Sequence, residues 1–130
     1  FYNCFNSPSG SLKWRHQFST TDTAEFAPAL SVDGTIYAAM QAVGGGGHLY
    51  SIDPSGNRNW VLKSFLSSGR PGGVTIGSDG TIYLGNAAIS ANGSKDWGDG
   101  NTFGAAAIAS NGDVYDVIEN LTAYSSSGNT

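Results

Sequence analysis

Only a few side chains in this sequence could bind a metal ion or act as a nucleophile, and they stand far apart. They are His16, His48 and the single cysteine, Cys4. A zinc site needs several such ligands close together, so we interpret both histidines as surface or strand residues. Cys4 excludes an internal disulfide, and we expect it to be a small apolar residue in a strand. No Gly-x-Ser-x-Gly sequence is present to form a nucleophile elbow.

The carboxylates form no acid–base pair that the sequence can identify. Three of them stand in predicted turns, where an aspartate side chain accepts hydrogen bonds from nearby backbone N–H groups: Asp33, Asp53 and Asp79. A second group provides oxygen atoms of the kind that calcium prefers: Asp96, Asp99 and Asn101. The spacing of this second group matches no EF-hand, so we interpret it as a solvated turn.

The run Gly44–Gly47 has the composition of a phosphate-binding loop. Such a loop continues into Gly-Lys-Ser/Thr and a helix, whereas here His48-Leu49-Tyr50 begins a predicted strand. We therefore predict a hairpin loop at this position. The candidate residues together predict no catalytic residue, no metal site and no bound cofactor.

The composition indicates a β protein with many turns. The 130 residues include 19 glycines, and only 12% of the residues are charged. The net charge of −4 and the scattered positions of the six basic residues disfavour nucleic acid as a partner, because phosphate binding needs clustered Lys and Arg. No apolar run approaches the roughly 20 residues that a membrane-spanning helix needs. We therefore expect no membrane span.

Two short motifs alternate along the chain and define a repeat. The first is Asp-Gly-Thr-Ile-Tyr at 33–37 and 79–83, with a looser copy, Asn-Gly-Asp-Val-Tyr, at 111–115. The second is Gly-x-x-x-Trp, which ends at Trp14, Trp60 and Trp97. A repeat of this length predicts an array of similar structural units. We predict a single segment, 1–130, with repeat units at about 10–55, 56–92 and 93–127.

Each repeat unit predicts antiparallel strands joined by tight turns. Asp-Gly or Asn-Gly between segments rich in Val, Ile, Thr and Tyr is a strong hairpin signal, and a type I′ turn requires positive φ at both central positions. We therefore expect positive φ at Gly34, Gly80 and Gly112. A further strand follows in each unit and leads through another turn to the tryptophan strand. No stretch has the apolar period of a helix.

The segment Leu49–Trp60 resembles the tryptophan-docking segment of quinoprotein-type (PQQ-like) β-propeller blades. That family also includes the propeller lipoprotein of the outer-membrane β-barrel assembly machinery. The family pattern reads roughly Ala-x-Asp-x-x-Thr-Gly-x-x-x-Trp; here Ser51 replaces the alanine, and the turn from Asp53 to Gly56 is one residue shorter. The resemblance extends over nearly the whole chain as a repeat. It implies an all-β fold of four-stranded antiparallel blades, with the tryptophan on the outermost strand.

Mapped in this way, the chain is a partial β-propeller that begins and ends inside a blade. Residues 3–10 align with 49–56 as the third strand of an incomplete blade. Two full blades end near Trp60 and Trp97, and the last three strands lie between Ala105 and Tyr124. Because propellers usually have about four to eight blades, this arc cannot close on itself.

Two sets of aromatic residues recur at fixed places in the repeat. They are Trp14, Trp60 and Trp97, and Tyr37, Tyr83 and Tyr115. We expect the tryptophans to dock between adjacent blades, where an aromatic side chain buries about 150–250 Å². The alternative is that the tryptophans stack on a ring ligand or a sugar. We expect the tyrosines to pack within the blades.

These observations favour a non-enzymatic, extracytoplasmic propeller segment that acts as a scaffold or protein-interaction surface. Its partners would be the remaining blades of a longer chain or neighbouring copies. We expect no isolated monomer, because unpaired strand edges at both ends invite pairing. The alternatives are a fragment of a quinoprotein dehydrogenase, with PQQ and calcium, and a carbohydrate-binding propeller. Such dehydrogenases typically carry an adjacent cysteine pair at the cofactor, whereas this chain has only Cys4.

Overall fold

The computed structural model describes residues 1–24, 26–63, 72–100, 104–117 and 120–129, and the regular structure in these ranges consists of strands alone. In chain order they are β1 (Tyr2–Phe5), β2 (Leu12–His16), β3 (Asp22–Ala24), β4 (Ala29–Leu30), β5 (Ile36–Ala42), β6 (Gly47–Ile52), β7 (Arg58–Leu62), β8 (Val74–Ile76), β9 (Ile82–Leu84), β10 (Ala87–Ile89), β11 (Lys95–Trp97), β12 (Ala107–Ile108), β13 (Val114–Val117) and β14 (Leu121–Tyr124). The prediction of an all-β chain is confirmed for these ranges. They contain no helix that is long and apolar enough to cross a membrane.

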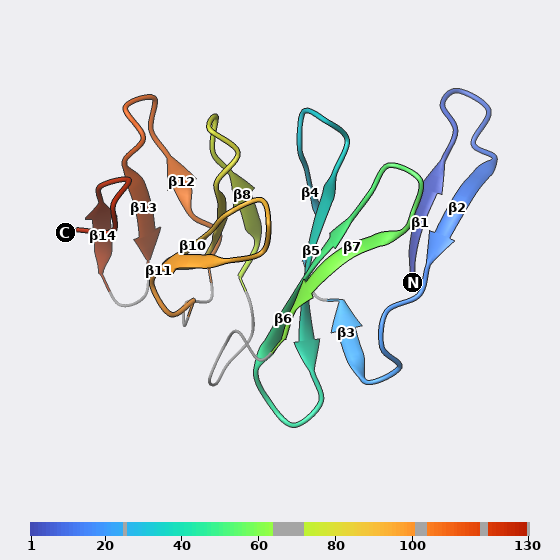
Figure 1. Ribbon diagram of the computed structural model, residues 1–130, viewed down its shortest axis with the longest axis horizontal. Coiled ribbons are helices and arrows are strands. Elements are labelled where there is room, and N and C mark those ends of the chain that lie inside the picture. Colours follow the sequence, from blue (N-terminus) through green and yellow to red (C-terminus); the bar gives the residue numbers. More distant parts are fainter. Residues whose placement is uncertain (25, 64–71, 101–103, 118–119, 130) are drawn as a thin grey trace.

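The strands form four antiparallel sheets that follow one another along the chain and lie side by side (Figure 1). The first sheet is the hairpin β1-β2. The second has the order β3-β5-β6-β7, with β4 also paired to β5, and the third has the order β8-β9-β10-β11. The fourth sheet has the order β12-β13-β14. This grouping agrees with the predicted strand positions, except for β3, which the repeat did not predict.

Turns with one shared hydrogen-bond pattern recur along the repeat, and a further turn with this pattern, starting at Ala42, joins β5 to β6 at the lower end in Figure 1. In each turn, the N–H of a glycine donates to the carbonyl oxygen of the residue three positions earlier. The N–H of that earlier residue donates to the carbonyl oxygen of the residue directly after the glycine. The turns of the repeat start at Ser31, Asp53, Gly77, Ser90, Ala109 and Ser125. Their glycines have φ values between 84° and 91°. The repeat in sequence is therefore a repeat in backbone conformation.

The positive φ predicted for the three motif glycines is confirmed, but the predicted type I′ turn is wrong. A type I′ hairpin would have only Asp33 and Gly34 in its loop. Instead, the Ser31 N–H donates to the Thr35 carbonyl at 2.9 Å, so the loop also includes Val32. This pattern is typical of a type I turn followed by a left-handed glycine. The Asp33 side chain favours the wider loop because its Oδ1 atom accepts the Thr35 N–H at 2.9 Å.

The predicted alignment of residues 3–10 with 49–56 is wrong by one residue. That alignment matches Cys4 with Tyr50. In the structure, Cys4 lies opposite Trp14 and Ser51 lies opposite Trp60, so Cys4 corresponds to Ser51 instead. The reason is the length of the first turn, where the glycine N–H donates to a carbonyl four residues earlier instead of three.

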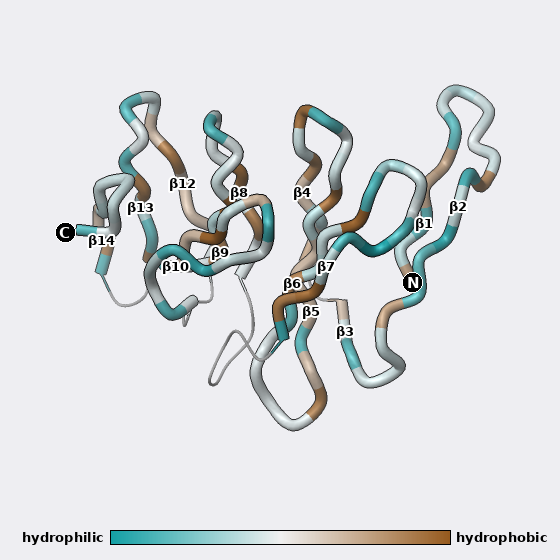
Figure 2. Tube along the Cα trace, viewed as in Figure 1, coloured by the Kyte–Doolittle hydropathy of each residue, from teal (hydrophilic) through white to brown (hydrophobic). Residues whose placement is uncertain are grey.

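Hydrophobic side chains pack between the sheets, because alternate residues of a strand point to opposite faces. In β5, Tyr37 and Ala39 pack toward the third sheet, whereas Ala38 and Met40 pack toward the first. Figure 2 shows hydrophobic stretches on β8 and β12 and along the second sheet, whereas β2 is mainly hydrophilic. Each of three core clusters joins residues of two neighbouring sheets. In the described ranges, side-chain packing therefore connects sheet to sheet.

Candidate functional site

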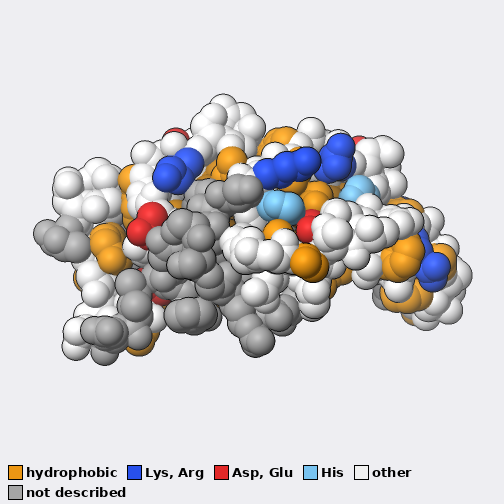
Figure 3. Space-filling view, turned by 90° about the horizontal axis from the view of Figure 1, so that it is seen from below, with side chains coloured by type: hydrophobic (Ala, Val, Ile, Leu, Met, Phe, Trp, Pro, Cys, Tyr) orange, Lys and Arg blue, Asp and Glu red, His pale blue; other side chains and the backbone are white. Residues whose placement is uncertain are grey.

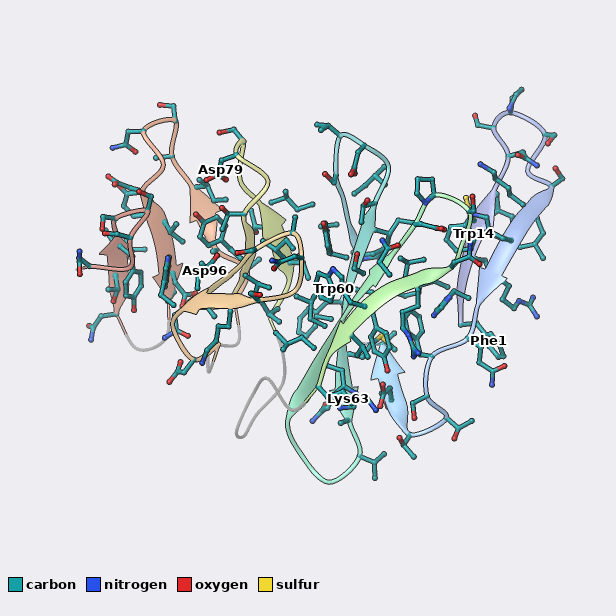
Figure 4. The ribbon with its side chains drawn as sticks, in the orientation of Figure 1. Phe1, Trp14, Trp60, Lys63, Asp79 and Asp96 are labelled. Atoms are coloured by element: carbon teal, nitrogen blue, oxygen red, sulfur yellow. The ribbon has the colours of Figure 1, made fainter. Side chains whose placement is uncertain are left out.

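Each tryptophan reaches from the last strand of its own sheet to a turn of the next sheet. The indole N–H groups donate to backbone carbonyl oxygens: Trp14 to Pro54 (2.9 Å), Trp60 to Ala91 (2.9 Å) and Trp97 to Ser126 (3.1 Å). In every case the acceptor lies two residues before the turn glycine. Figure 4 shows Trp14 between β2 and the turn that follows β6. The predicted set of tryptophans therefore makes one contact three times.

The turn glycine provides the surface on which the indole lies. A β-carbon would approach the indole ring to 2.8 Å at Gly56, 2.9 Å at Gly93 and 2.7 Å at Gly128. Carbon atoms attract one another best at about 3.5–4.0 Å, so no larger residue fits without moving the indole. We call these three turns, at 53–57, 90–94 and 125–129, the filled docking turns.

A hydrophobic residue at the end of the preceding strand completes each filled docking turn. Ile52 and Ile89 are fully buried and belong to the same core clusters as Trp14 and Trp60. Tyr124 has this position in the fourth sheet, and its ring centre lies 5.8 Å from that of Trp97. Each indole is thus held by a hydrogen bond, a glycine and a hydrophobic side chain.

The motif tyrosines contact the indoles from within the same sheet. The ring centres of Tyr37 and Trp60 lie 5.9 Å apart, and those of Tyr83 and Trp97 lie 6.0 Å apart. Both tyrosines are buried, and burial together with the charge of a nearby turn aspartate raises the pKa of each phenol. Tyr115 is half-buried, and no tryptophan packs against it in the ranges that the structure describes.

The first turn, at residues 6–11, has the same parts but holds no indole from the described residues. A β-carbon on Gly10 would meet no described atom within 4 Å, although the φ of Gly10 is also positive (+67°). Phe5 corresponds to Ile52 in the second sheet, yet it is 57% exposed. The carbonyl at the acceptor position is that of Pro8. All three tryptophans of the chain are bound to other turns. We call residues 6–11 the open docking turn.

The first sheet also has a free strand edge. Among the described strands, β1 pairs only with β2. A pocket of about 410 Å³ borders β1, with Cys4 and Trp14 on one side and Leu30 and Ile36 on the other. Leu30 is 70% exposed. The pocket therefore lies between the first and second sheets.

The turn aspartates have structural roles, as predicted. Asp33 and Asp79 each accept the backbone N–H two residues later, and these bonds lower the pKa of both carboxyl groups. Asp53 accepts the side-chain amide and the backbone N–H of Asn57, and these bonds lower its pKa as well. All three carboxylates are thus held within their own turns.

One polar cluster was not predicted, and it joins Asp22, His48 and Tyr50. The Asp22 side chain is fully buried, and its Oδ2 atom accepts the Tyr50 hydroxyl at 2.6 Å and the His48 Nδ1 at 3.0 Å. Burial and the bond to Asp22 raise the pKa of Tyr50 to about 12. His48 lies in a strand, as predicted, but it is not isolated. The sequence could not show this, because 26 residues separate Asp22 from His48.

The other histidine and the cysteine are half-buried strand residues, as predicted. His16 lies in β2, where its Nδ1 donates to the carbonyl oxygen of Gly56 at 2.8 Å. Cys4 lies in β1 opposite Trp14 and is a free thiol. In the described part of the chain, no three His, Cys, Asp or Glu side chains gather as metal ligands.

The acidic segment after Ser90 is only partly described. Asp96 lies in β11 rather than in a loop, and its carboxylate accepts the Ser90 hydroxyl at 2.7 Å. Asn101 lies outside the described residues. Gly44, Gly45 and Gly46 lie in the hairpin connection between β5 and β6, as predicted, and Gly47 is the first residue of β6.

Asp116 is a buried carboxylate that sequence reasoning missed. It follows the third motif tyrosine, at the position of Ala38 and Leu84 in the other repeats. Like them it is buried, at 2% exposed. Asp116 lies on the same face of β13 as Val114, which packs toward the third sheet. Neither carboxylate oxygen has a hydrogen-bond partner among the described residues.

Comparison with known proteins does not extend this description. No protein-family model matches the sequence, and no curated protein matches it either. The resemblance to PQQ-like blades therefore rests on the repeated residues of the sequence alone.

The docking contact predicts that a Gly→Ala substitution lowers the free energy of unfolding by different amounts in different turns. Gly93→Ala, Gly80→Ala and Gly10→Ala each place a β-carbon at positive φ, which costs about 1–2 kcal/mol. Only Gly93→Ala also drives that carbon against an indole, that of Trp60. We expect this variant to lose about 1–3 kcal/mol more free energy of unfolding than the other two. Urea unfolding of the three variants measures the difference, and equal losses would contradict the docking contact.

The burial of Asp116 predicts a stabilising substitution. Asp116→Val removes a buried carboxylate that has no hydrogen-bond partner among the described residues, and it adds a residue that favours strands. We expect the free energy of unfolding at neutral pH to rise by about 1–3 kcal/mol. Asp116→Asn keeps a buried polar group and should gain less. A loss of stability in the valine variant, measured by the same urea unfolding, would contradict this prediction and show that the carboxylate has a stabilising hydrogen-bond partner.

Proposed function

We propose that this chain is an extracytoplasmic segment of a PQQ-like β-propeller that acts as a non-enzymatic scaffold and protein-interaction surface. The observation that carries the proposal is the contact between indole and turn glycine, made three times and left open at residues 6–11. In this proposal the four sheets are blades and the docking turns are the joints between them. The extracytoplasmic location is inferred from the family resemblance of Leu49–Trp60 alone.

The strand orders support this proposal. In the second and third sheets, the strand that carries the tryptophan lies at one edge, as β7 and β11. The first sheet has the counterparts of only the last two strands, and the fourth sheet has the counterparts of the first three. Partial blades at both ends of a propeller arc would have this composition.

The outer face of the first sheet has the chemistry of a protein interface. Phe5 and Leu12 flank the open docking turn and are 57% and 50% exposed. Beside them, the Arg15 guanidinium donates to Asn3 at 2.9 Å and lies 5.3 Å from the ring centre of Phe1. A hydrophobic centre with a polar surround is typical of protein–protein interfaces.

The partner that fits this face is a strand that carries a tryptophan. Its indole would lie on Gly10, contact Phe5 and donate to the Pro8 carbonyl, as the indoles of the filled docking turns do in their own turns. Remaining blades of a longer chain would supply such a strand. At the opposite end, Val117 and Leu121 are 56% and 71% exposed in the fourth sheet, where a neighbouring copy could pair with β14.

The proposal predicts that the purified 130-residue segment associates. Sedimentation velocity and native mass spectrometry over a range of concentrations should detect species heavier than the 13.4 kDa monomer, because the free edges pair. Phe5→Lys should reduce this association, since it places a charge beside the open docking turn and leaves the filled docking turns intact. Val43→Lys is the matched control, because Val43 is equally a surface residue, 75% exposed in the loop between β5 and β6.

Two results would contradict the proposal. One is a stable monomer at every concentration with the unfolding behaviour of a complete fold. The other is equal association of the Phe5→Lys and Val43→Lys variants, which would place the contact elsewhere on the molecule.

A further inference from the structure

One row of side chains crosses the second and third sheets at the level of the tryptophan. In each sheet a motif tyrosine lies opposite a small residue of the next strand, and that residue lies opposite the tryptophan. The two rows are Tyr37, Ser51 and Trp60 in the second sheet and Tyr83, Ala88 and Trp97 in the third. Directly opposite residues of antiparallel strands point to the same face, so each row presents two aromatic rings to the neighbouring sheet. We call this arrangement the aromatic row.

The first sheet has only two of the three positions of the aromatic row. Cys4 lies opposite Trp14, so Cys4 stands where Ser51 and Ala88 stand in the other rows. The position of the tyrosine lies on the other side of Cys4, on a strand that would pair with the free edge of β1. Among the described strands β1 pairs only with β2, so none of them fills this position.

The pocket of about 410 Å³ beside β1 lies at this position. Its walls include Cys4 and Trp14 from the aromatic row of the first sheet, and Leu30 and Ile36 from the second sheet. No charged side chain is among the described residues that line it. The end of the molecule that carries the first sheet also has exposed hydrophobic side chains, which are seen at the right of Figure 3. The pocket therefore suits an uncharged, largely hydrophobic side chain.

The second sheet contains two hydrophobic residues that a tyrosine in this pocket would cover. Leu30 and Ile36 flank the first motif turn as Ile76 and Ile82 flank the second. Ile76 and Ile82 both pack in the core cluster that contains Tyr37. Ile82 is fully buried there, whereas Ile36 is only half-buried and Leu30 is 70% exposed. The difference in burial follows from the presence of a motif tyrosine in one interface and its absence from the other.

The interface between the third and fourth sheets gives the same result. Ile108 and Val114 flank the third motif turn, and both pack with Tyr83 in one core cluster. Val114 is fully buried, like Ile82. A motif tyrosine therefore covers these two positions in both interfaces that contain one.

We propose that the pocket beside β1 binds the tyrosine of an extended strand that pairs antiparallel with β1. The tyrosine lies opposite Cys4, its ring packs beside Trp14, and it covers Leu30 and Ile36. The backbone of the strand bonds along the free edge of β1, and the pocket selects the side chain. This inference rests on the proposed function, because it names a second strand that the first sheet needs besides the tryptophan strand at the open docking turn.

The strand that fits is a further copy of the motif Asp-Gly-Thr-Ile-Tyr. Tyr37 and Tyr83 fill the equivalent positions of the other two interfaces from this motif. A second copy of the chain has no such strand free, since the strands of Tyr37, Tyr83 and Tyr115 are paired on both sides. The occupant is therefore a strand from a further repeat unit.

A peptide with the sequence of residues 33–41, blocked at both ends, tests this proposal, because this segment carries the first copy of the motif. It is titrated into the labelled 130-residue chain at the lowest protein concentration that gives a signal. NMR follows the backbone amide signals of residues 2–5, and alkylation reports on Cys4, the single thiol of the sequence. The peptide should give saturable shifts in β1 and should slow the alkylation of Cys4, because the added strand covers the thiol.

Two altered peptides separate the aromatic ring from the backbone pairing. The Tyr37→Ala peptide keeps the backbone and should bind about tenfold more weakly or worse, because it has no ring to fill the pocket. The Tyr37→Phe peptide keeps the ring and should bind within about threefold of the parent peptide.

Two variants of the chain form a matched pair. Leu30→Lys places a charge in the wall of the pocket and should weaken binding of the parent peptide about tenfold or more. Leu121→Lys is the control, because Leu121 is 71% exposed, as Leu30 is 70% exposed, but lies in the fourth sheet. The Leu121→Lys variant should bind the peptide as the parent chain does.

The proposal is overturned if the parent peptide gives no saturable shifts in β1, or if the Tyr37→Ala peptide binds equally well. Undiminished binding by Leu30→Lys, or a loss of binding in Leu121→Lys instead, would also overturn it. Shifts in β1 that grow with protein concentration and exclude the peptide would assign the pocket to a second copy of the chain. Failure of the peptide while the association still depends on Phe5 would overturn this inference and leave the proposed function standing.

Discussion

The contact between an indole and a turn glycine is the constraint on which the rest of this structure depends. The sheets share no strands in the described ranges, so their spacing is set by side chains that cross from one sheet to the next. The tryptophan is the largest of these, and its N–H fixes it to a carbonyl of the next sheet. Burial of most of an indole contributes a few kcal/mol of stability. Glycine is required for two reasons. The turn needs positive φ at this position, and the indole occupies the space that a β-carbon would fill.

Much of this arrangement could be predicted from sequence because its signals are local and repeated. Asp-Gly and Asn-Gly mark the hairpins, and the constant offset from glycine to tryptophan marks the outer strands. The positions of the strands and the positive φ of Gly34 and Gly80 followed from these signals. The turn type did not, because a dipeptide does not show whether the residue before it also enters the loop. Val32 does enter the loop, where the bond between Ser31 and Thr35 closes around it.

The features that sequence could not show depend on residues distant in the chain. Asp22, His48 and Tyr50 come from different strands, and β3 carries no repeat motif. Asp116 occupies a position that the other repeats fill with alanine or leucine. Because the third copy of the motif is the least similar one, its sequence did not indicate that this aspartate is buried. Both aspartates place an acceptor without a described donor inside an otherwise apolar packing arrangement. The repeat therefore accounts for the stacking of the sheets, whereas these buried polar groups depart from it.

The most direct test of the docking contact is the chemical shift of the glycine α-protons in solution. A proton above the face of an indole is shielded by the ring current and resonates at unusually high field. The structure predicts this displacement for Gly56, Gly93 and Gly128, whose would-be β-carbons point at Trp14, Trp60 and Trp97, and ordinary shifts for Gly10. Ordinary shifts at all four glycines would contradict the docking contact. A displaced signal for Gly10 in the isolated chain would contradict the open docking turn.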